Sequence, residues 1–238
     1  MNSIEFSIIV PVFHEAERIN DLIESLNRLD SDRNIEIIIV DGSQERDTLI
    51  AVRSKQIVKI SSEKGRAIQM NAGAFVAKGE VLIFLHADTE LPIRALGKIH
   101  SLMERSDYVA GAFDLGIKSD KFIYKAIGTL SSLRSRLSRI PFGDQAIFIR
   151  KEYFDRMGGY KEIPLMEDVE LMRRIKRSEK KIRIFYDRVM TSPRRWEKEG
   201  VIYCTVRDWT LRILYLFGMS PDRLAKYYKN GYGSPRKN

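Results

Sequence analysis

The chain of 238 residues contains a single cysteine, Cys204, and this scarcity excludes several structural classes. Neither an intramolecular disulfide nor a metal site built from several cysteines can form. Small disulfide-stabilised folds are therefore excluded, and the composition suits a reducing cytoplasm. With 44% hydrophobic and 31% charged residues, the chain can fold around a substantial core of its own.

Long hydrophobic runs are also missing. The first residues, MNSIEFSIIVPVFHE, lack a basic segment followed by a long apolar stretch, so we expect no signal peptide. The most apolar later run, Val201 to Met219, is interrupted by Arg207, Asp208 and Arg212, and such a run is not typical of a membrane span. We expect a cytoplasmic protein.

Two common nucleotide-binding signatures are absent. The turn after the first predicted strand reads PVFHEAER instead of G-x-G-x-x-G, and no G-K-[ST] phosphate loop occurs. Ordinary dehydrogenases and P-loop enzymes are therefore disfavoured. Acidic residues are fewer than basic ones, and the resulting net charge of +9 favours an anionic partner. Nucleic acid, anionic lipid and phosphate-bearing substrates would all satisfy it.

The chain does contain an alternation of aliphatic runs and helical patterns. Helical spacing marks Ala16–Leu29 and helical composition marks Arg66–Ala77. The aliphatic runs lack polar alternation, as expected for strands of a parallel sheet that is covered on both faces. They lie at Phe6–Val10, Ile35–Val40, Ile57–Ile60 and Glu80–Leu85. The pattern predicts an α/β fold with a parallel, Rossmann-like sheet.

Beyond Pro92 the alternation weakens, and we predict an α+β extension. Strands are expected at Tyr108–Leu115 and Gln145–Ile149 around a basic stretch, Lys118–Arg139, and a helix is expected to begin near Glu167. We predict a single domain with three parts: a first half (1–92), a second half (93–200), and a C-terminal helical segment (201–238). Residues 230–238 are expected to form a flexible basic tail.

Polar side chains follow the predicted strands where ligands bind in parallel sheets. Glu15 follows the first strand, Asp41 the second, and His86-Ala87-Asp88 the fourth. An acid after one strand can hold a nucleotide base, and an acid after the next strand can hold a divalent cation that binds the nucleotide's diphosphate. Mg²⁺ or Mn²⁺ would fit oxygen ligands of this kind.

Seven segments resemble family 2 glycosyltransferases, which have the GT-A fold, and the resemblance covers roughly the whole chain. The combination of GRAIQMN with LHADT is similar to a compact bacterial subgroup of that family. The resemblance implies an inverting, metal-dependent transfer from a nucleotide-diphosphate sugar to an acceptor hydroxyl. The segments are IIVPVFHE, VDGSQERDT, KGRAIQMNAGA, LHADTELP, GDQAIFIRK, MEDVEL and RRW.

The resemblance also implies that residues 1–92 form the nucleotide-sugar-binding half, with the donor site, and that residues 93–200 form the acceptor and catalytic half. It places Pro11 to Glu15 and Asp41 in the nucleotide-base pocket, where the Asp41 carboxylate would accept a hydrogen bond from the base. Asp41 could instead cap a turn, and Glu15 could be a helix-start charge. Near the diphosphate and ribose the resemblance places Lys64, Gly65, Arg66 and Asn71, although both cations could be ordinary surface charges.

In the family's D-x-D motif, Asp88 matches the second acid, which is the metal ligand, whereas His86 departs from the first. His86 could bind a metal, hydrogen-bond the ribose or pack in the core. Glu167-Asp168 matches the family's E-D pair, so Asp168 is the expected catalytic base, although acids here could also be capping residues. The acceptor and phosphate side is expected to contain Asp144, Gln145, Glu167, Arg195 and Trp196. Ser192 replaces the glutamine of the processive pattern Q-x-x-R-W, which argues against processive synthesis.

The partners are less closely defined. We expect a nucleotide-diphosphate sugar as donor, with a UDP-sugar favoured, and the resemblance leaves the acceptor and oligomeric state open. A nucleotidyltransferase would carry a glycine-rich loop after its first strand, which PVFHEAER lacks. A nucleic-acid-binding module is disfavoured because Arg134, Arg136 and Arg139 lack interleaved aromatics. We therefore expect no nucleic-acid partner.

The segment Val201 to Met219 carries apolar residues at helical spacing, including Trp209. One interpretation is an amphipathic helix on the inner face of the cell membrane, which would bring the site to a lipid-linked acceptor. The other is that this stripe packs on the catalytic domain or on a second subunit, as apolar helical faces commonly do.

Overall fold

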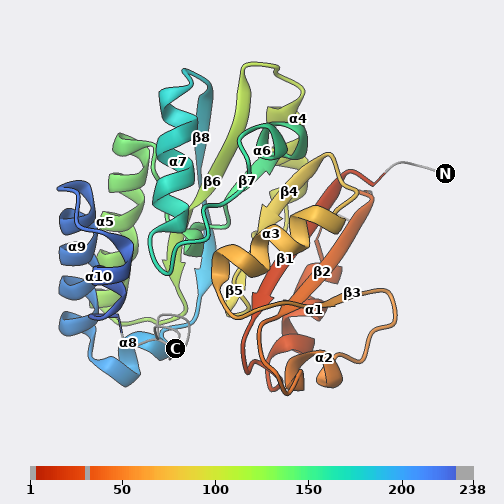
Figure 1. The fold of residues 1–238 in the computed structure, drawn as a ribbon, viewed down its shortest axis with the longest axis horizontal. Coiled ribbons are helices and arrows are strands. Elements are labelled where there is room, and N and C mark those ends of the chain that lie inside the picture. Colours follow the sequence, from red (N-terminus) through yellow and green to blue (C-terminus); the bar gives the residue numbers. More distant parts are fainter. Residues whose placement is uncertain (1–3, 30–32, 229–238) are drawn as a thin grey trace.

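The computed structural model describes residues 4–29 and 33–228, which fold around one eight-stranded sheet of order β3-β2-β1-β4-β7-β6-β8-β5 (Figure 1). The strands are β1 (Phe6–Val12), β2 (Ile35–Asp41), β3 (Val58–Ser61), β4 (Val81–Phe84), β5 (Thr89–Glu90), β6 (Tyr108–Ile117), β7 (Phe148–Arg150) and β8 (Lys181–Thr191). The helices are α1 (Ile19–Asn27), α2 (Asp47–Ala51), α3 (Arg66–Val76), α4 (Ala95–Met103), α5 (Phe122–Ser138), α6 (Lys151–Arg156), α7 (Glu167–Arg177), α8 (Arg194–Glu199), α9 (Val201–Leu216) and α10 (Pro221–Ala225), with a 3-10 turn η1 (Gly143–Gln145).

The first half forms the parallel part of the sheet, because β1 pairs in parallel with both β2 and β4, and β2 pairs with β3. Every residue of β1 and β4 is buried. This explains why these strands lack polar alternation: both faces of the sheet are covered.

Alternate residues of the strands enter two separate core layers. On one face, Ile9, Val40 and Phe84 pack with apolar residues of α3 and α7. On the other face, Ile8 and Ile39 pack with apolar residues of α1 and α4. The result is a three-layer α/β/α arrangement, and the predicted α/β fold class is confirmed.

The second half departs from the parallel pattern. β7 is antiparallel to both of its neighbours, β4 and β6, while β8 runs parallel to β6. The predicted strand at 145–149 is shorter than expected, since Gln145 lies in η1 and the strand begins at Phe148. β8 was not predicted from the sequence, although its buried and exposed positions alternate over much of its length, which is the pattern of a half-covered strand.

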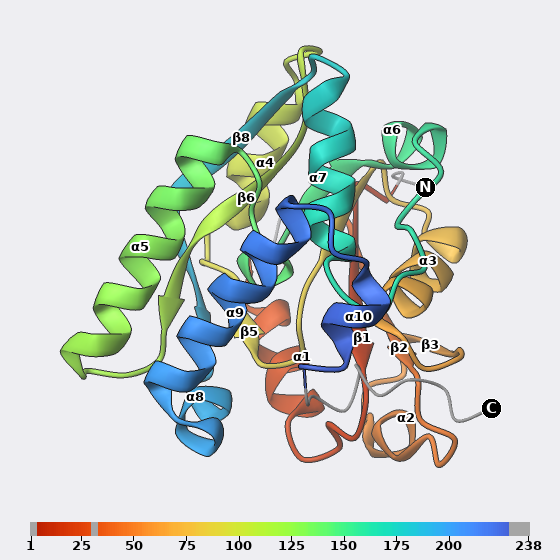
Figure 2. The same cartoon turned by 60° about the vertical axis from the view of Figure 1, so that its left-hand side comes forward.

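The basic stretch 118–139 is largely helical, and its helix, α5, packs against β6. In Figures 1 and 2, α5 and α9 lie on the same side of the molecule, away from β1 to β3. A small third core joins them: Tyr124 and Ile127 of α5 pack with Trp196 of α8 and Cys204 of α9. The predicted helix after residue 201 is confirmed, whereas residues 230–238 lie outside the described part of the chain.

Candidate functional site

One cleft of about 740 Å³ collects side chains from both halves of the chain. Its lining comes from the carboxyl ends of β1 and β4, the first residues of α3 and α7, and the helices α5, α8 and α9. Nine predicted site residues line it: Pro11, Glu15, Arg66, His86, Asp88, Asp144, Asp168, Arg195 and Trp196. Asp41, Lys64, Gly65, Asn71, Gln145 and Glu167 are not among its lining residues.

Asp41 is fully buried at the end of β2. Its Oδ1 accepts a hydrogen bond from the backbone N–H of Ser43 at 2.8 Å, so this oxygen caps the turn that follows β2. Its Oδ2 is buried and has no hydrogen-bond partner among the described residues. The carboxylate therefore retains one acceptor atom, so its contact with a nucleotide base stays a prediction.

Sequence analysis did not single out Gln69, a fully buried amide next to Asp41 in space. Its Nε2 donates to the backbone carbonyls of Val12 at 2.7 Å and Val40 at 2.8 Å, so it holds together the ends of β1 and β2. A Cβ on Gly42 would lie 2.9 Å from this amide, so a larger residue there would have to displace the amide from its two hydrogen bonds. The signal was the glutamine of GRAIQMN, whose spacing from the helix start puts it on the buried face of α3.

Ion pairs between distant parts of the chain shape the donor side of the cleft. Arg66 at the start of α3 pairs with the buried Glu167 at 3.1 Å. Glu15 pairs with Arg194 at 3.0 Å across 179 residues of sequence, and sequence analysis missed Arg194. The predicted Glu15 and Glu167 therefore each neutralise an arginine, which fixes the positions of both guanidinium groups.

His86 and Asp168 approach the same backbone atom from two elements. A Cβ placed on Gly143 would lie 3.0 Å from His86 Nε2 and 3.5 Å from Asp168 Oδ2. Burial, with Arg66 nearby, lowers the pKa of His86 to about 4, so the ring is neutral at pH 7. Because His86 lines the cleft, it is not a packed core histidine.

Asp168 lies at the start of α7, after Met166, whose φ of 68° turns the chain in the left-handed region. Its Oδ2 accepts a hydrogen bond from the Gly143 N–H at 2.6 Å, and its Oδ1 accepts one from the Val169 N–H at 2.7 Å. Both bonds orient the carboxylate in the cleft while leaving lone pairs on each oxygen. This carboxylate is suitably placed to accept a proton.

Asp144 is the second acid on this side of the cleft. Burial raises its pKa to about 6, although Arg195 and Arg134 oppose the shift. Its Oδ1 is buried and has no hydrogen-bond partner within the described chain. Arg195 is itself held by Asp208 and by the hydroxyl of Tyr228, each at 2.6 Å. Asp208 and Tyr228, which also line the cleft, were missed because their sequence context carries no family motif.

The remaining predicted residues have structural contacts. Asn71 forms hydrogen bonds of 2.9 Å with both the backbone N–H and the carbonyl of Tyr160. Gln145 is fully buried and donates to the Phe113 carbonyl at 2.8 Å. The ammonium of Lys64 lies 4.4 Å from the centroid of the Phe13 ring, at the edge of the cleft. Their contacts with substrates stay predictions.

The residues at the end of β4 fit a divalent cation that shares its coordination with a substrate. Asp88 lines the cleft, and among the described residues its only side-chain hydrogen bond is one of 3.4 Å from Thr89. No group of three or more His, Cys, Asp or Glu residues forms a complete metal cage in the described chain. Mg²⁺ commonly binds through one or two carboxylates plus substrate phosphates, so a single half-buried carboxylate in the cleft is compatible with that mode.

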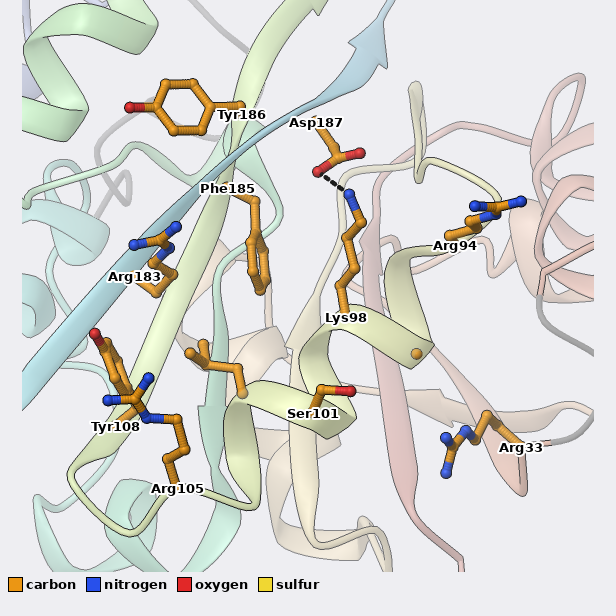
Figure 3. A pocket seen from close by; sticks show the side chains of 12 residues that line it. Arg33, Arg94, Lys98, Ser101, Arg105, Tyr108, Arg183, Phe185, Tyr186 and Asp187 are labelled. Atoms are coloured by element: carbon orange, nitrogen blue, oxygen red, sulfur yellow. Dashed lines mark hydrogen bonds and ion pairs between the residues drawn. The ribbon is translucent and has the colours of Figure 1, made fainter.

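A second hollow of about 910 Å³ lies between α4 and β8 (Figure 3). Its cations are largely engaged: Lys98 pairs with Asp187 at 2.6 Å, Arg33 with Glu5 at 3.4 Å and Arg105 with Asp107 at 3.7 Å. The carboxylates of the D-x-D-like and E-D motifs lie outside it. The motif residues therefore favour the cleft as the functional site.

The three-layer α/β/α arrangement, with a cleft at the carboxyl ends of β1 and β4, defines a GT-A-type α/β protein. The chain belongs to Glycosyl transferase family 2, whose sequence profile matches residues 7–161. Most of the predicted cleft residues lie within the matched segment, and Asp168, Arg195 and Trp196 lie beyond it.

Two curated relatives agree with this family. The uncharacterized glycosyltransferase YfnE of Bacillus subtilis (strain 168) is 31% identical over 88 residues, which are 34% of this chain and 22% of that protein. An uncharacterized glycosyltransferase of Haemophilus influenzae (strain ATCC 51907 / DSM 11121 / KW20 / Rd) is 29% identical over 163 residues, which are 64% of this chain and 55% of that protein. The matches thus span about half or less of these relatives.

Two solved structures share the fold. The mannosyltransferase PcManGT from Pyrobaculum calidifontis, in complex with GDP-Man and Mn²⁺, has a TM-score of 0.66 at 18% identity. The match covers 99% of this chain and 66% of the PcManGT chain. S. aureus TarS 1-349, in complex with UDP-GlcNAc, has a TM-score of 0.62 at 16% identity. The match covers 79% of this chain and 58% of the TarS chain. The predicted GT-A fold is confirmed by these likenesses.

Proposed function

We propose that this chain is an inverting glycosyltransferase that moves a sugar from a nucleotide-diphosphate sugar to an acceptor hydroxyl. The observation that carries the proposal is the convergence of Asp88, His86 and Asp168 in one cleft, from elements 80 residues apart in sequence. Membership of the family and the two nucleotide-sugar-bound structures of the same fold support it.

In this proposal the donor's diphosphate lies along the β1, β4 and α3 side of the cleft. Arg66, fixed by Glu167, and Arg194, fixed by Glu15, supply positive charge there. Neutral His86 can donate or accept one hydrogen bond with the sugar or ribose. The unpaired Oδ2 of Asp41 is the acceptor assigned to the base's N–H.

Asp168 is the assigned general base. The acceptor oxygen forms a bond to the anomeric carbon, the bond from that carbon to the diphosphate oxygen breaks, and Asp168 takes the hydroxyl proton. The leaving diphosphate gains negative charge as the bond breaks. A divalent cation held by Asp88, with Mn²⁺ or Mg²⁺ as candidates, would neutralise that charge when bound.

We also propose a lipid-linked acceptor and peripheral contact with an anionic membrane through α5 and α9. Each helix exposes an apolar stripe: Phe122, Leu130, Leu133 and Leu137 on α5, and Ile202, Val206, Trp209, Ile213 and Leu216 on α9. Contrary to one interpretation of the sequence, the α9 stripe is not packed on the described part of the domain. Both helices also line the cleft, and together they carry five cations and one acid.

Of these cations, Lys125 is exposed, whereas Arg207 is buried and paired with Glu199. The exposed Lys125, with Arg223 of α10, favours an anionic bilayer as the occupant of the α5–α9 face, with Trp209 at headgroup level. In the described residues 4–29 and 33–228, no helix is long and apolar enough to cross a bilayer. In this proposal, α5 and α9 lie on the bilayer surface and contact it through their exposed side chains.

A thermal-shift panel tests the donor assignment. Wild-type protein is heated with UDP- and GDP-sugars, with and without Mn²⁺, and a binder is expected to raise the Tm only when the cation is present. Asp88→Ala should abolish this shift, whereas Asp155→Asn, which changes an exposed acid outside the cleft, should retain it. An equal shift in EDTA would contradict the metal assignment, and no shift with any sugar nucleotide would contradict the function.

A further inference from the structure

The arginines around the cleft differ in how they are neutralised. Arg66, Arg194, Arg195 and Arg207 each pair with a carboxylate. Arg134 of α5 and Arg212 of α9 form no ion pair with any residue that the structure describes. For both side chains the Nε atom is buried and lacks a hydrogen-bond partner in the described chain. Arg134 Nη2 does donate hydrogen bonds to Ser135 Oγ at 2.9 Å and to Gln145 Oε1 at 3.4 Å, but both partners are neutral. Two partly buried guanidinium groups thus lack a counter-ion among the described residues.

Both arginines lie against the same aromatic ring. The Arg134 guanidinium is 3.7 Å from the centroid of the Phe142 ring, and that of Arg212 is 5.2 Å from it. Phe142 lines the cleft and directly precedes Gly143, whose N–H binds Asp168. The ring can stabilise the cations by cation–π attraction, but it cannot neutralise their mutual repulsion.

Helical spacing carries both arginines toward the cleft. On α5, Arg134 follows the cleft-lining residues Ile127 and Ser131 at i+7 and i+3. On α9, Arg212 follows the cleft-lining Thr205 and Trp209 at the same two spacings. Residues at these spacings share one helical face, so the pair continues the cleft wall by one turn on each helix.

The electrostatic effect on each group is consistent with a missing anion. Burial and the nearby charge of Arg212 lower the pKa of Arg134 to about 10. Burial also lowers the pKa of Arg212. The charges of Asp144 and Asp168 reach Arg134, and that of Asp168 reaches Arg212, but neither acid is within ion-pair distance of either arginine in the described chain.

We infer that Arg134 and Arg212 form a subsite for an anionic group, of the phosphate class, carried by the acceptor molecule. The inference rests on the proposed function, because it uses the assignment of this half of the cleft to the acceptor. The subsite lies between the apolar stripes of α5 and α9 and beside the assigned base. An amphiphile with a phosphate head and an apolar tail matches that combination of surfaces.

The test measures binding of a simple amphiphile rather than turnover. Octyl phosphate, octanol and inorganic phosphate are titrated separately against the full chain, free and with a nucleoside diphosphate and Mn²⁺. Fluorescence reports binding, since both tryptophans of the chain, Trp196 and Trp209, line the cleft. We expect octyl phosphate to bind more tightly than octanol, because only the phosphate engages the arginines.

Arg212→Met is expected to weaken octyl phosphate by about tenfold or more and to leave octanol unchanged, as for loss of a charged hydrogen bond. Arg212→Lys should recover part of the affinity, and Arg134→Met should act as Arg212→Met does. The matched control is Arg183→Met in the second hollow (Figure 3), which should have no effect. If Arg134→Met fails to fold, the Arg212 variants suffice.

Equal affinity of octyl phosphate for wild type and Arg212→Met would overturn the inference, as would equal affinity for octyl phosphate and octanol. Inorganic phosphate that binds as tightly as octyl phosphate, with the same dependence on Arg212, would support the anion subsite and show that free phosphate suffices. Failure of the donor assignment is distinguishable, because it appears in the thermal-shift panel and leaves these titrations unaffected.

Discussion

At the scale of single residues, Asp168 carries the chemical step of the proposed reaction. Asp168→Asn is expected to lower kcat by about 10²–10⁴-fold while leaving the affinity for the donor nearly unchanged. The amide can still accept one of the two backbone hydrogen bonds, from Gly143 or Val169, but it cannot take a proton. Steady-state kinetics with the donor identified by thermal shift, set beside its binding constant, separate the two effects.

The control for Asp168 is Asp155→Asn, an exposed carboxylate on α6 that should leave both kcat and donor binding as they are. A variant at Asp168 that lost donor affinity but kept kcat at saturation would place this carboxylate in the donor site instead.

Asp144 gives a pH-dependent prediction at the same scale. Its pKa rises from 3.8 to about 6 on folding, so the native state holds a proton that the unfolded state has released between these values. Stability should therefore fall as the pH rises from about 4 to about 6. Asp144→Asn removes this loss, so the variant should gain about 1–2 kcal/mol relative to wild type across that window, after allowance for partial exposure.

Urea unfolding at several pH values measures the difference for Asp144, with Asp155→Asn as a variant whose curve should run parallel to wild type. A constant difference between Asp144→Asn and wild type from pH 4 to pH 7 would show that the carboxyl is not perturbed.

At the scale of elements, the packing of α5 on β6 depends on the absence of a side chain at Gly128. A Cβ there would lie 2.7 Å from the backbone carbonyl oxygen of Leu115. Gly128→Ala should therefore destabilise the protein by about 1–3 kcal/mol despite the better helix propensity of alanine. The exposed neighbour Thr129→Ala should change the free energy of unfolding by no more than about 0.5 kcal/mol.

Chemical denaturation of both helix variants gives the comparison for α5. If Gly128→Ala were as stable as Thr129→Ala, the close approach of α5 to β6 would be incorrect.

Strands β1, β2 and β4 could be predicted from the sequence, whereas the buried face of α5 could not. β1, β2 and β4 were predictable because both of their faces are covered, which leaves uninterrupted aliphatic runs. α5 has the reverse of the usual pattern: small and polar residues such as Gly128, Ser132 and Ser135 are buried, whereas Leu133 and Leu137 are exposed. A periodicity argument assigns the apolar stripe of such a helix to the core, and no local signal corrects it.

The candidate site divides in a similar way. Acids at strand ends were predictable, because the order of motifs along the chain fixed which strand each one follows. Partners such as Arg194, which pairs with Glu15, depend on how the C-terminal helices return to the sheet. Arg134 and Arg212 belong to the same group: each is an ordinary surface cation in the sequence, and only the packing around Phe142 leaves both without a carboxylate in the described chain.

At the scale of the whole molecule, α5 and α9 lie on the same side of the fold (Figure 2). Both helices line the cleft, so the cleft lies at the edge of their exposed apolar stripes. The exposed apolar residues of the α5–α9 face are 42–83% accessible, which is costly unless a partner covers them. Flanking cations such as Lys125 and Arg223 would face lipid phosphates if the helices lay on a bilayer. Docking in that orientation would present the cleft to a lipid-linked acceptor without removing the acceptor from its membrane.

Co-sedimentation with vesicles tests this orientation. The full chain should bind vesicles containing an anionic phospholipid at low salt and bind neutral phosphatidylcholine vesicles weakly, and salt should reduce the binding by screening the charges. Leu133→Gln with Leu137→Gln, or Ile213→Gln alone, should weaken binding because each removes apolar area from the face. Phe75→Gln, on an exposed residue of α3 outside the face, is the matched control. Sedimentation equilibrium of the free protein supplies the contrasting outcome: if the chain ignored anionic vesicles but self-associated in a manner abolished by the same α5 variants, a second copy rather than a membrane would cover this face.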